Sequence, residues 1–300
     1  MKKIGKTKNR FRNEVSLYVM LAPFTVMFFL FLILPIIASV ALSFTSYDMV
    51  HKMDFVGIRN YFRMFVDDEV FLTTVKNTIL FSFFTGPVGF LLSFVLAWFI
   101  NEFKPAIRTF LSFLFYAPAL VGNAYYIWQV AFSNDSYGYI NSVLLSMNLI
   151  TEPISWLKNE VYVLPVIMIV QLWQSMGISF LSNISGLQNV NAELYEAGAI
   201  DGIRSRWQEL WYITLPAMKH MLLFSAVMQI QSSFTVGSIA VELAGYPSVG
   251  NAADTMVAYM SDVGTVRYEL GYACAIAVCL FAIMAFTRWL IGKVLNSVGK

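Results

Sequence analysis

Two neighbouring stretches govern the interpretation of this chain: Glu193-Leu194-Tyr195-Glu196-Ala197-Gly198-Ala199-Ile200-Asp201-Gly202 and, further on, Ile213-Thr214-Leu215-Pro216. They are polar and lie within a chain that is 58% hydrophobic and only 13% charged. A soluble domain carries about 25% charged residues, so an outer surface that faces lipid explains the deficit. The net charge of +2 is too small to indicate nucleic-acid binding. A charged segment at one side of such a protein indicates a docking surface for a soluble partner.

Six apolar runs are long enough to cross a bilayer, which takes about 20 helical residues. The sequence predicts spans near residues 17–44, 78–100, 110–132, 161–181, 216–241 and 270–291. The first run is too long for a cleavable signal peptide and predicts an uncleaved anchor. We therefore expect an all-α membrane protein with six transmembrane helices.

The basic residues predict the orientation. With the N-terminus inside, fourteen of the 20 Lys and Arg fall in inner segments and the other six in outer segments. This asymmetry follows the positive-inside rule and places both termini and the polar stretches in the cytoplasm. In the outer loops, apolar residues at 140, 143, 144 and 147 have helical spacing, and a second short helix is expected at 256–260. These loops either form a docking surface or merely cap the bundle.

Local signals predict two short helices in the polar stretch. Asn191 is a plausible N-cap, and Glu193 lies in the first turn, where the helix dipole favours negative charge. Gly202 can end this helix in a left-handed conformation. Ser205 with Gln208 forms a capping-box pattern for a second helix that runs toward Pro216.

These residues resemble a known motif. Glu196-Ala197-Gly198-Ala199-Ile200-Asp201-Gly202, with Ile213-Thr214-Leu215-Pro216 downstream, looks like the EAA loop of ATP-binding-cassette importer permeases. The chain is similar, more narrowly, to the first permease of carbohydrate-uptake systems of the maltose and lactose type. Further matching stretches are Lys76-Asn77-Thr78-Ile79-Leu80, Gly138-Tyr139-Ile140-Asn141 and Gly186-Leu187-Gln188. Gly198 departs from the motif, which usually has alanine there, and His220 stands where a proline is common.

The resemblance implies a type I importer permease fold with a cytoplasmic coupling loop at about 190–215. The expected division is a basic N-terminus (1–16), a first transmembrane helix (17–44), an outer loop (45–77), a core permease domain (78–291) and a cytoplasmic C-terminus (292–300). The coupling residues carried over are Glu196, Ala197, Gly198, Ala199, Asp201 and Gly202, with Glu196 as the contact to the ATPase.

The same resemblance implies the partners: a second permease, two ATP-binding-cassette ATPases and an extracytoplasmic solute-binding protein, in a bacterial or archaeal plasma membrane. The sequence has no Gly-rich phosphate-binding loop and no convincing catalytic or metal-ligating arrangement. We therefore expect no enzymatic activity and no cofactor in this chain, with ATP and Mg²⁺ bound by the ATPases.

Polar residues within the spans are candidates for the transport pathway, because burying them in lipid is costly. Alignment with the maltose-type relatives and the local polarity select Trp173, Gln174, Ser175 and Ile178 on the fourth span, and Gln229, Ile230, Gln231 and Ser233 on the fifth. Asn123, Tyr125, Tyr126 and Gln129 are further candidates on the third. The alternative role for these side chains is hydrogen bonding between helices.

The sequence thus predicts the permease subunit of an ATP-driven importer for a sugar or oligosaccharide. The alternatives left open are import of glycerol phosphate or another small solute by the same architecture, an ATP-independent transporter, and a membrane scaffold. The spans hold almost no acidic residues, which disfavours ion-coupled transport.

Overall fold

The computed structural model describes the backbone of residues 17–297, and helices form nearly all of its regular structure. Four described helices are long and apolar enough to cross a membrane: Leu17–Leu42, α4 (Glu69–Asn101), α8 (Val163–Gln188) and α15 (Leu270–Ser297), of which 270–293 forms the span. A bent pair, Arg206–Ala217 and Lys219–Phe234, adds a fifth span if counted as one. The all-α fold is confirmed, while the predicted N-terminal segment 1–16 and residues 298–300 lie outside the described part.

Shorter helices connect these spans. The first span contains the π-helix η1 (Phe29–Ile33) and ends in α2 (Leu34–Leu42); α3 (Arg59–Phe62) and η2 (Arg63–Asp67) lead into α4. Between α4 and α8 lie α5 (Pro105–Leu120), α6 (Tyr126–Ala131) and α7 (Tyr139–Ser146). After α8 come α9 (Ala192–Ile200), α10 (Arg206–Glu209), η3 (Leu210–Thr214), α11 (Leu215–Ala217) and α12 (Lys219–Phe234). The last connections are α13 (Ser238–Ala244), η4 (Val249–Asn251), α14 (Met256–Ser261) and η5 (Asp262–Val266).

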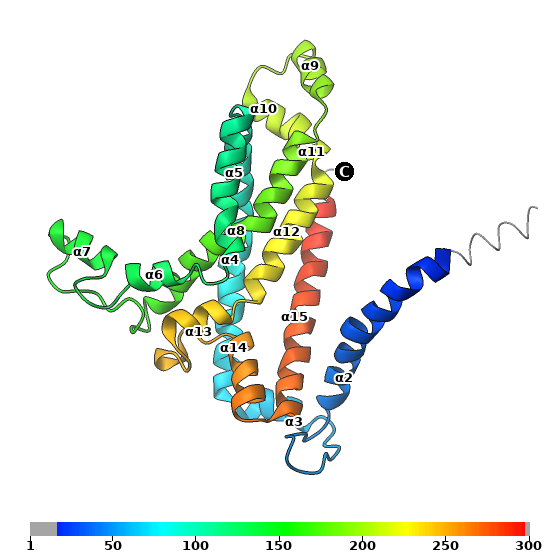
Figure 1. Cartoon of the computed structure of the whole chain (residues 1–300), viewed down its shortest axis with the longest axis vertical. Coiled ribbons are helices and arrows are strands. Elements are labelled where there is room, and N and C mark those ends of the chain that lie inside the picture. Colours follow the sequence, from blue (N-terminus) through cyan, green and yellow to red (C-terminus); the bar gives the residue numbers. More distant parts are fainter. Residues whose placement is uncertain (1–16, 298–300) are drawn as a thin grey trace, which may run out of the picture.

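Two predicted spans are shorter than expected. The predicted third span, 110–132, is not one helix: α5 ends at Leu120, Val121 is extended, and α6 starts a separate direction (Figure 1). Pro118 and Gly122 explain the break, because neither favours continuation of a helix. The predicted fifth span, 216–241, reaches only Phe234, and Met218 leaves helical geometry at an 81° bend. The two predicted outer helices are confirmed as α7 and α14.

The first span leans away from the bundle and stays exposed along its length (Figure 1). Its C-terminal end is held by hydrogen bonds to backbone carbonyls. Asn60 Nδ2 donates to the carbonyls of Ser43 and Thr45 at 2.8 and 2.9 Å, and the Gly271 N–H donates to the Tyr47 carbonyl at 2.8 Å. The span is therefore anchored to α3 and α15 at one end only.

The helix α4 runs through the centre of the molecule and contributes to three apolar clusters. At the N-terminal end of α4 Phe71 packs with residues of α14 and α15, near the middle Phe81 packs with α8 and α13, and at the C-terminal end Ala97 and Ile100 pack with α8 and η3. Apart from the first span, the described spanning helices therefore all pack on α4, either directly or through these clusters.

Buried polar side chains fasten α4, α8 and α12 together. The Gln229 side chain is fully buried; its Nε2 donates to Ser175 Oγ at 2.8 Å, and its Oε1 accepts from Ser179 Oγ at 3.1 Å. It lies against Gly89 of α4, where a Cβ atom would stand 2.8 Å from the Gln229 Cδ atom. Only glycine leaves room for this amide, because its hydrogen bonds fix the side chain.

We expect Gly89→Ala to destabilise the bundle by about 1–3 kcal/mol, the usual cost of overpacking. The added methyl must displace Gln229 and break its bonds to Ser175 and Ser179. The measurement is thermal unfolding of the detergent-purified protein. Gly292→Ala is the matched control, because no atom of the described residues lies within 4 Å of a Cβ there. Equal unfolding temperatures for the two variants would contradict the packing argument.

Candidate functional site

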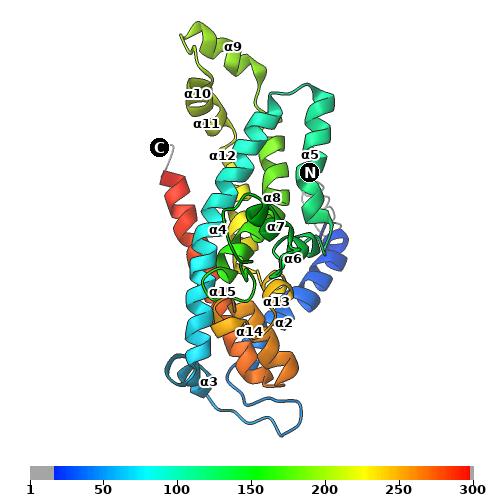
Figure 2. The ribbon, with the colours of Figure 1, turned by 90° about the vertical axis from the view of Figure 1, so that its left-hand side faces the viewer.

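The polar stretch forms two helices joined by a glycine turn, as the sequence predicts. The Asn191 side chain accepts from the Glu193 N–H at 3.1 Å and caps α9. Gly202 has a φ of +95°, in the left-handed region that favours glycine. Ser205 and Gln208 form the predicted capping box at the start of α10. We name residues 191–217 the coupling segment; its first helix, α9, projects beyond the end of the bundle in both views (Figures 1 and 2).

One face of α9 is packed and the other is free. Gly198 is buried, and a Cβ atom there would stand 2.6 Å from Ile213 Cδ1, which explains glycine in place of the usual alanine. The Tyr195 hydroxyl is 2.9 Å from Thr214 Oγ1 on η3. The exposed residues include five of the predicted coupling residues: Glu196, Ala197, Ala199, Asp201 and Gly202. Beside them the apolar side chain of Ile200 is 87% exposed. The resemblance to the EAA loop did not include Ile200 among the predicted coupling residues.

The predicted pathway residues do not form one lining. Gln229, Ser175 and Ser233 lie inside the bundle: the first two bond each other, and Ser233 Oγ donates to the Ile230 carbonyl at 2.7 Å. In this conformation their hydrogen-bonding groups serve contacts between and within helices. Ile178, by contrast, is 54% exposed on the outer face of α8.

Ile230 and Gln231 line a groove of about 760 Å³ between α12 and α15. On the α15 side, the groove is lined by Phe281, Met284, Arg288 and Lys293. The last two belong to the C-terminal part of α15, and this end of the helix lies on the same side of the molecule as the coupling segment (Figure 1). The sequence alone does not place these two basic residues beside Gln231, because the pairing of α12 with α15 is a tertiary contact.

An aromatic group surrounds the remaining candidates. Trp173 packs edge-on against Trp128 with ring centroids 5.6 Å apart, and Trp128 also stacks on Phe132. Next to Trp173 in sequence, Gln174 has a buried Oε1 atom without a hydrogen-bond partner, and Trp128 Nε1 is likewise unpaired. Of the third-span candidates, Tyr125 is buried and donates to Asn123 Oδ1 at 3.3 Å, whereas Tyr126 and Gln129 are exposed.

The connection around α7 is organised by one side chain. Asn141 is fully buried, and its Nδ2 donates to the carbonyls of Ser133, Asp135 and Ile154 at 3.0–3.1 Å. Its Oδ1 accepts from the Ile154 N–H and from Trp156 Nε1 at 2.9 Å. This asparagine thereby fixes the loops on both sides of α7 to each other.

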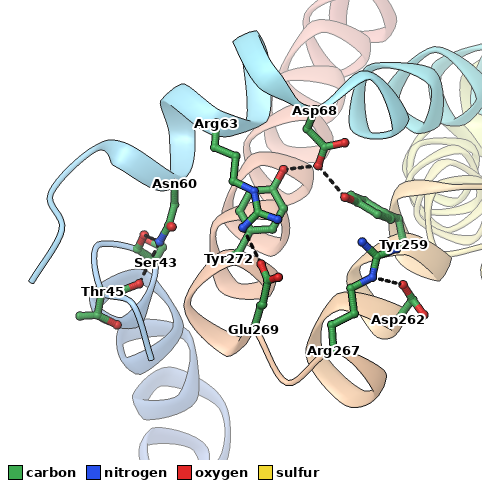
Figure 3. Close-up of polar contacts among 10 residues, drawn as sticks. All are labelled: Ser43, Thr45, Asn60, Arg63, Asp68, Tyr259, Asp262, Arg267, Glu269 and Tyr272. Atoms are coloured by element: carbon green, nitrogen blue, oxygen red, sulfur yellow. Dashed lines mark hydrogen bonds and ion pairs between the residues drawn. The ribbon is translucent and has the colours of Figure 1, made fainter. Parts of the chain in front are cut away.

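A second polar group lies at the N-terminal end of α4 (Figure 3). Asp68 caps α4 and accepts from the hydroxyls of Tyr259 on α14 and Tyr272 on α15. Burial raises the pKa of Asp68, but these hydrogen bonds outweigh it and hold the pKa below its ordinary value. Arg63 pairs with Glu269 and lies over the Tyr272 ring, 4.3 Å from its centroid. We name Arg63, Asp68, Tyr259, Glu269 and Tyr272 the outer cluster.

Comparison with known proteins assigns the family. Residues 87–298 match the family described as "Binding-protein-dependent transport system inner membrane component". The chain belongs to this family. It is therefore a permease subunit and not itself an enzyme, and the family works with a second permease, ATPases and a solute-binding protein. The alternatives of a membrane scaffold and an ATP-independent transporter do not fit this membership.

Individual relatives cover most of this permease. The arabinooligosaccharides transport system permease protein AraP of Bacillus subtilis (strain 168) is 29% identical over 91% of the chain and 86% of its own length. The lactose transport system permease protein LacF of Rhizobium radiobacter is 29% identical over 71% of each chain. A bacterial transporter that imports the acidic polysaccharide alginate has a chain of the same fold, with a TM-score of 0.79, 22% identity, and coverage of 98% and 100%.

We expect Asn141→Ala in this permease to loosen the α7 connection, because each buried group left unpaired costs about 1–3 kcal/mol. Limited proteolysis should then cut within residues 133–157 at lower protease concentration than in the wild type. Ser142→Ala is the control, since Ser142 is exposed and adjacent. Equal cleavage of both variants would show that Asn141 does not organise this region.

Proposed function

We propose that this permease subunit carries a sugar or oligosaccharide, driven by ATPases that dock on the free face of α9. The observation that carries the proposal is the two-sided geometry of this helix. Gly198 and Tyr195 tie it to η3, so a force on α9 reaches the spans, while Glu196 stands free to meet a basic partner. A short, firmly backed helix with an exposed charge suits a docking element.

The chain would act with a second permease and two ATPases, which would bind the ATP and Mg²⁺, and a solute-binding protein would deliver the substrate. Two features support a second permease. The first span is exposed along its length, and a groove of about 760 Å³ opens between α12 and α15. Both surfaces face lipid or another subunit, and a pathway between two bundles would use the groove.

The proposed orientation places the coupling segment and the C-terminus in the cytoplasm. The coupling segment and the C-terminal end of α15 lie toward the same end of the molecule (Figure 1), and the distribution of Lys and Arg favours that end as the inner one. The outer cluster and α14 then lie on the other side, where the binding protein would approach. The proposed division keeps the first span (17–44) separate from the core (78–291).

Neutral polar groups next to aromatic rings support a sugar as the substrate. The buried Oε1 atom of Gln174 has no partner and can accept a hydrogen bond from a hydroxyl group, and Trp173 offers an aromatic face nearby. Transport systems of the relatives are named for arabinooligosaccharides and lactose. Arg288 and Lys293 in the groove favour a second candidate, an anionic solute such as an acidic saccharide or glycerol phosphate.

The first test is Glu196→Lys in proteoliposomes that contain both permeases, the ATPase and the binding protein. We expect the ATPase to stop copurifying and sugar-stimulated hydrolysis to collapse, because the reversed charge repels the basic partner. Glu152→Lys is the matched control, an exposed glutamate in an outer connection. Unchanged docking and hydrolysis in Glu196→Lys would refute the assignment of α9 as the docking element.

A second test concerns the substrate. Gln174→Ala should raise the apparent KM for the sugar by about three- to tenfold, since one hydrogen bond contributes about 0.5–1.5 kcal/mol. Hydrolysis without sugar should not change. The control is Gln188→Ala, which alters an exposed glutamine at the far end of the same helix. An unchanged KM in uptake assays would remove Gln174 from the pathway.

A further inference from the structure

Two contacts join the coupling segment to the end of α4, over a hundred residues earlier in the chain. Arg206 Nη2 donates to Glu102 Oε2 at 2.9 Å, and Glu102 is the C-cap residue of α4. Beside it the rings of Trp207 and Trp98 pack with centroids 5.2 Å apart. The second carboxylate at this arginine is Glu209, which accepts from Nη1 at 2.9 Å.

These contacts border a polar cavity. The cavity measures about 260 Å³, and its lining includes Glu102, Arg206, Glu209 and the bonded pair Tyr195 and Thr214. The side chains that hold α9 on η3 and those that hold α10 on α4 therefore meet at one place. A displacement of α9 acts on all of them together.

The chain connects the coupling segment to α12 through a bend, whereas α4, which the segment contacts through Arg206 and Trp207, is a continuous helix. The segment joins α12 across the 81° bend at Met218. The helix α4 has 33 residues, and at about 1.5 Å per residue it extends about 50 Å. Its opposite end is Asp68 in the outer cluster, bonded to Tyr259 and Tyr272 (Figure 3).

We propose that Arg206 is a positioning residue that clamps the coupling segment to α4, so that α4 transmits movement of the segment to the outer cluster. This inference rests on the proposed docking of ATPases on α9. It adds a second mechanical connection that does not pass through the chain link to α12. The guanidinium is suited to the task because its planar fork holds two carboxylates in fixed directions.

The clamp serves orientation more than stability. The Arg206 and Glu102 side chains are 65% and 46% exposed, and exposed ion pairs contribute little to the free energy of folding. Loss of the pair should therefore leave the fold and the docking of the ATPase intact. It should reduce the fraction of ATP hydrolysis that responds to substrate.

The experiment uses the complete transporter in proteoliposomes, with Arg206→Gln in this subunit. We expect the ATPase to copurify as in the wild type, and the stimulation of hydrolysis by substrate-loaded binding protein to fall about two- to fivefold, the effect that one exposed ion pair can supply. Glu102→Gln should have the same effect, and the double variant should be no worse than either single one. The matched control is Arg204→Gln, an exposed arginine two residues earlier in the same segment, which leaves the bond between Arg206 and Glu102 in place and should keep the wild-type stimulation.

Rescue provides the readout that a merely structural role would not produce: Glu102→Arg combined with Arg206→Glu should restore part of the stimulation. Wild-type stimulation in Arg206→Gln, or additive losses in the double variant, would overturn the clamp. Loss of ATPase copurification in Arg206→Gln would also overturn it, because Arg206 would then act in docking. If Glu196→Lys abolishes docking of the ATPase while Arg206→Gln behaves as wild type, the clamp is refuted and the proposed function stands. If docking is unchanged in Glu196→Lys, the proposed function itself is refuted.

Discussion

The close approach of α4 to α12 is the constraint on which the rest of the bundle depends. Gly89 leaves space for the amide of Gln229, and this amide in turn bonds Ser175 and Ser179 of α8. In a bilayer the apolar surfaces of helices gain little from meeting one another, so close packing and hydrogen bonds between helices must hold them. This glycine contact and a glutamine bonded through both ends of its amide satisfy both requirements in the core of α4, α8 and α12.

Because α4 occupies the centre, its two ends join parts of the molecule that lie far apart. One end meets the coupling segment through Trp98 and Glu102, and the other caps itself with Asp68 among the tyrosines of the outer cluster. A helix packed along its length on α8 and α12 moves with them as a body. This arrangement suits a transporter that must relate events on its two sides, since rigid elements change position together.

The coupling segment was predictable because its signals are local. Caps, a glycine turn and a capping box act within a few residues, and each was found at Asn191, Gly202 and Ser205 as expected. The pathway was less predictable, because polarity in a span does not reveal the direction of a side chain. Gln229 points into the bundle, while Gln231, two residues on, lines the groove with Arg288 of α15. That pairing depends on how α12 and α15 lie together.

The sequence by itself determined an all-helical membrane protein, the position of α9 and the short helices α7 and α14, because hydrophobic length and capping are properties of contiguous residues. Only the tertiary structure decided that Gly198 must lack a side chain next to Ile213, that Gln231 shares a groove with Arg288, and that Arg206 meets Glu102. These features arise where segments distant in the chain come into contact, and the energy of such contacts depends on geometry that no single segment contains.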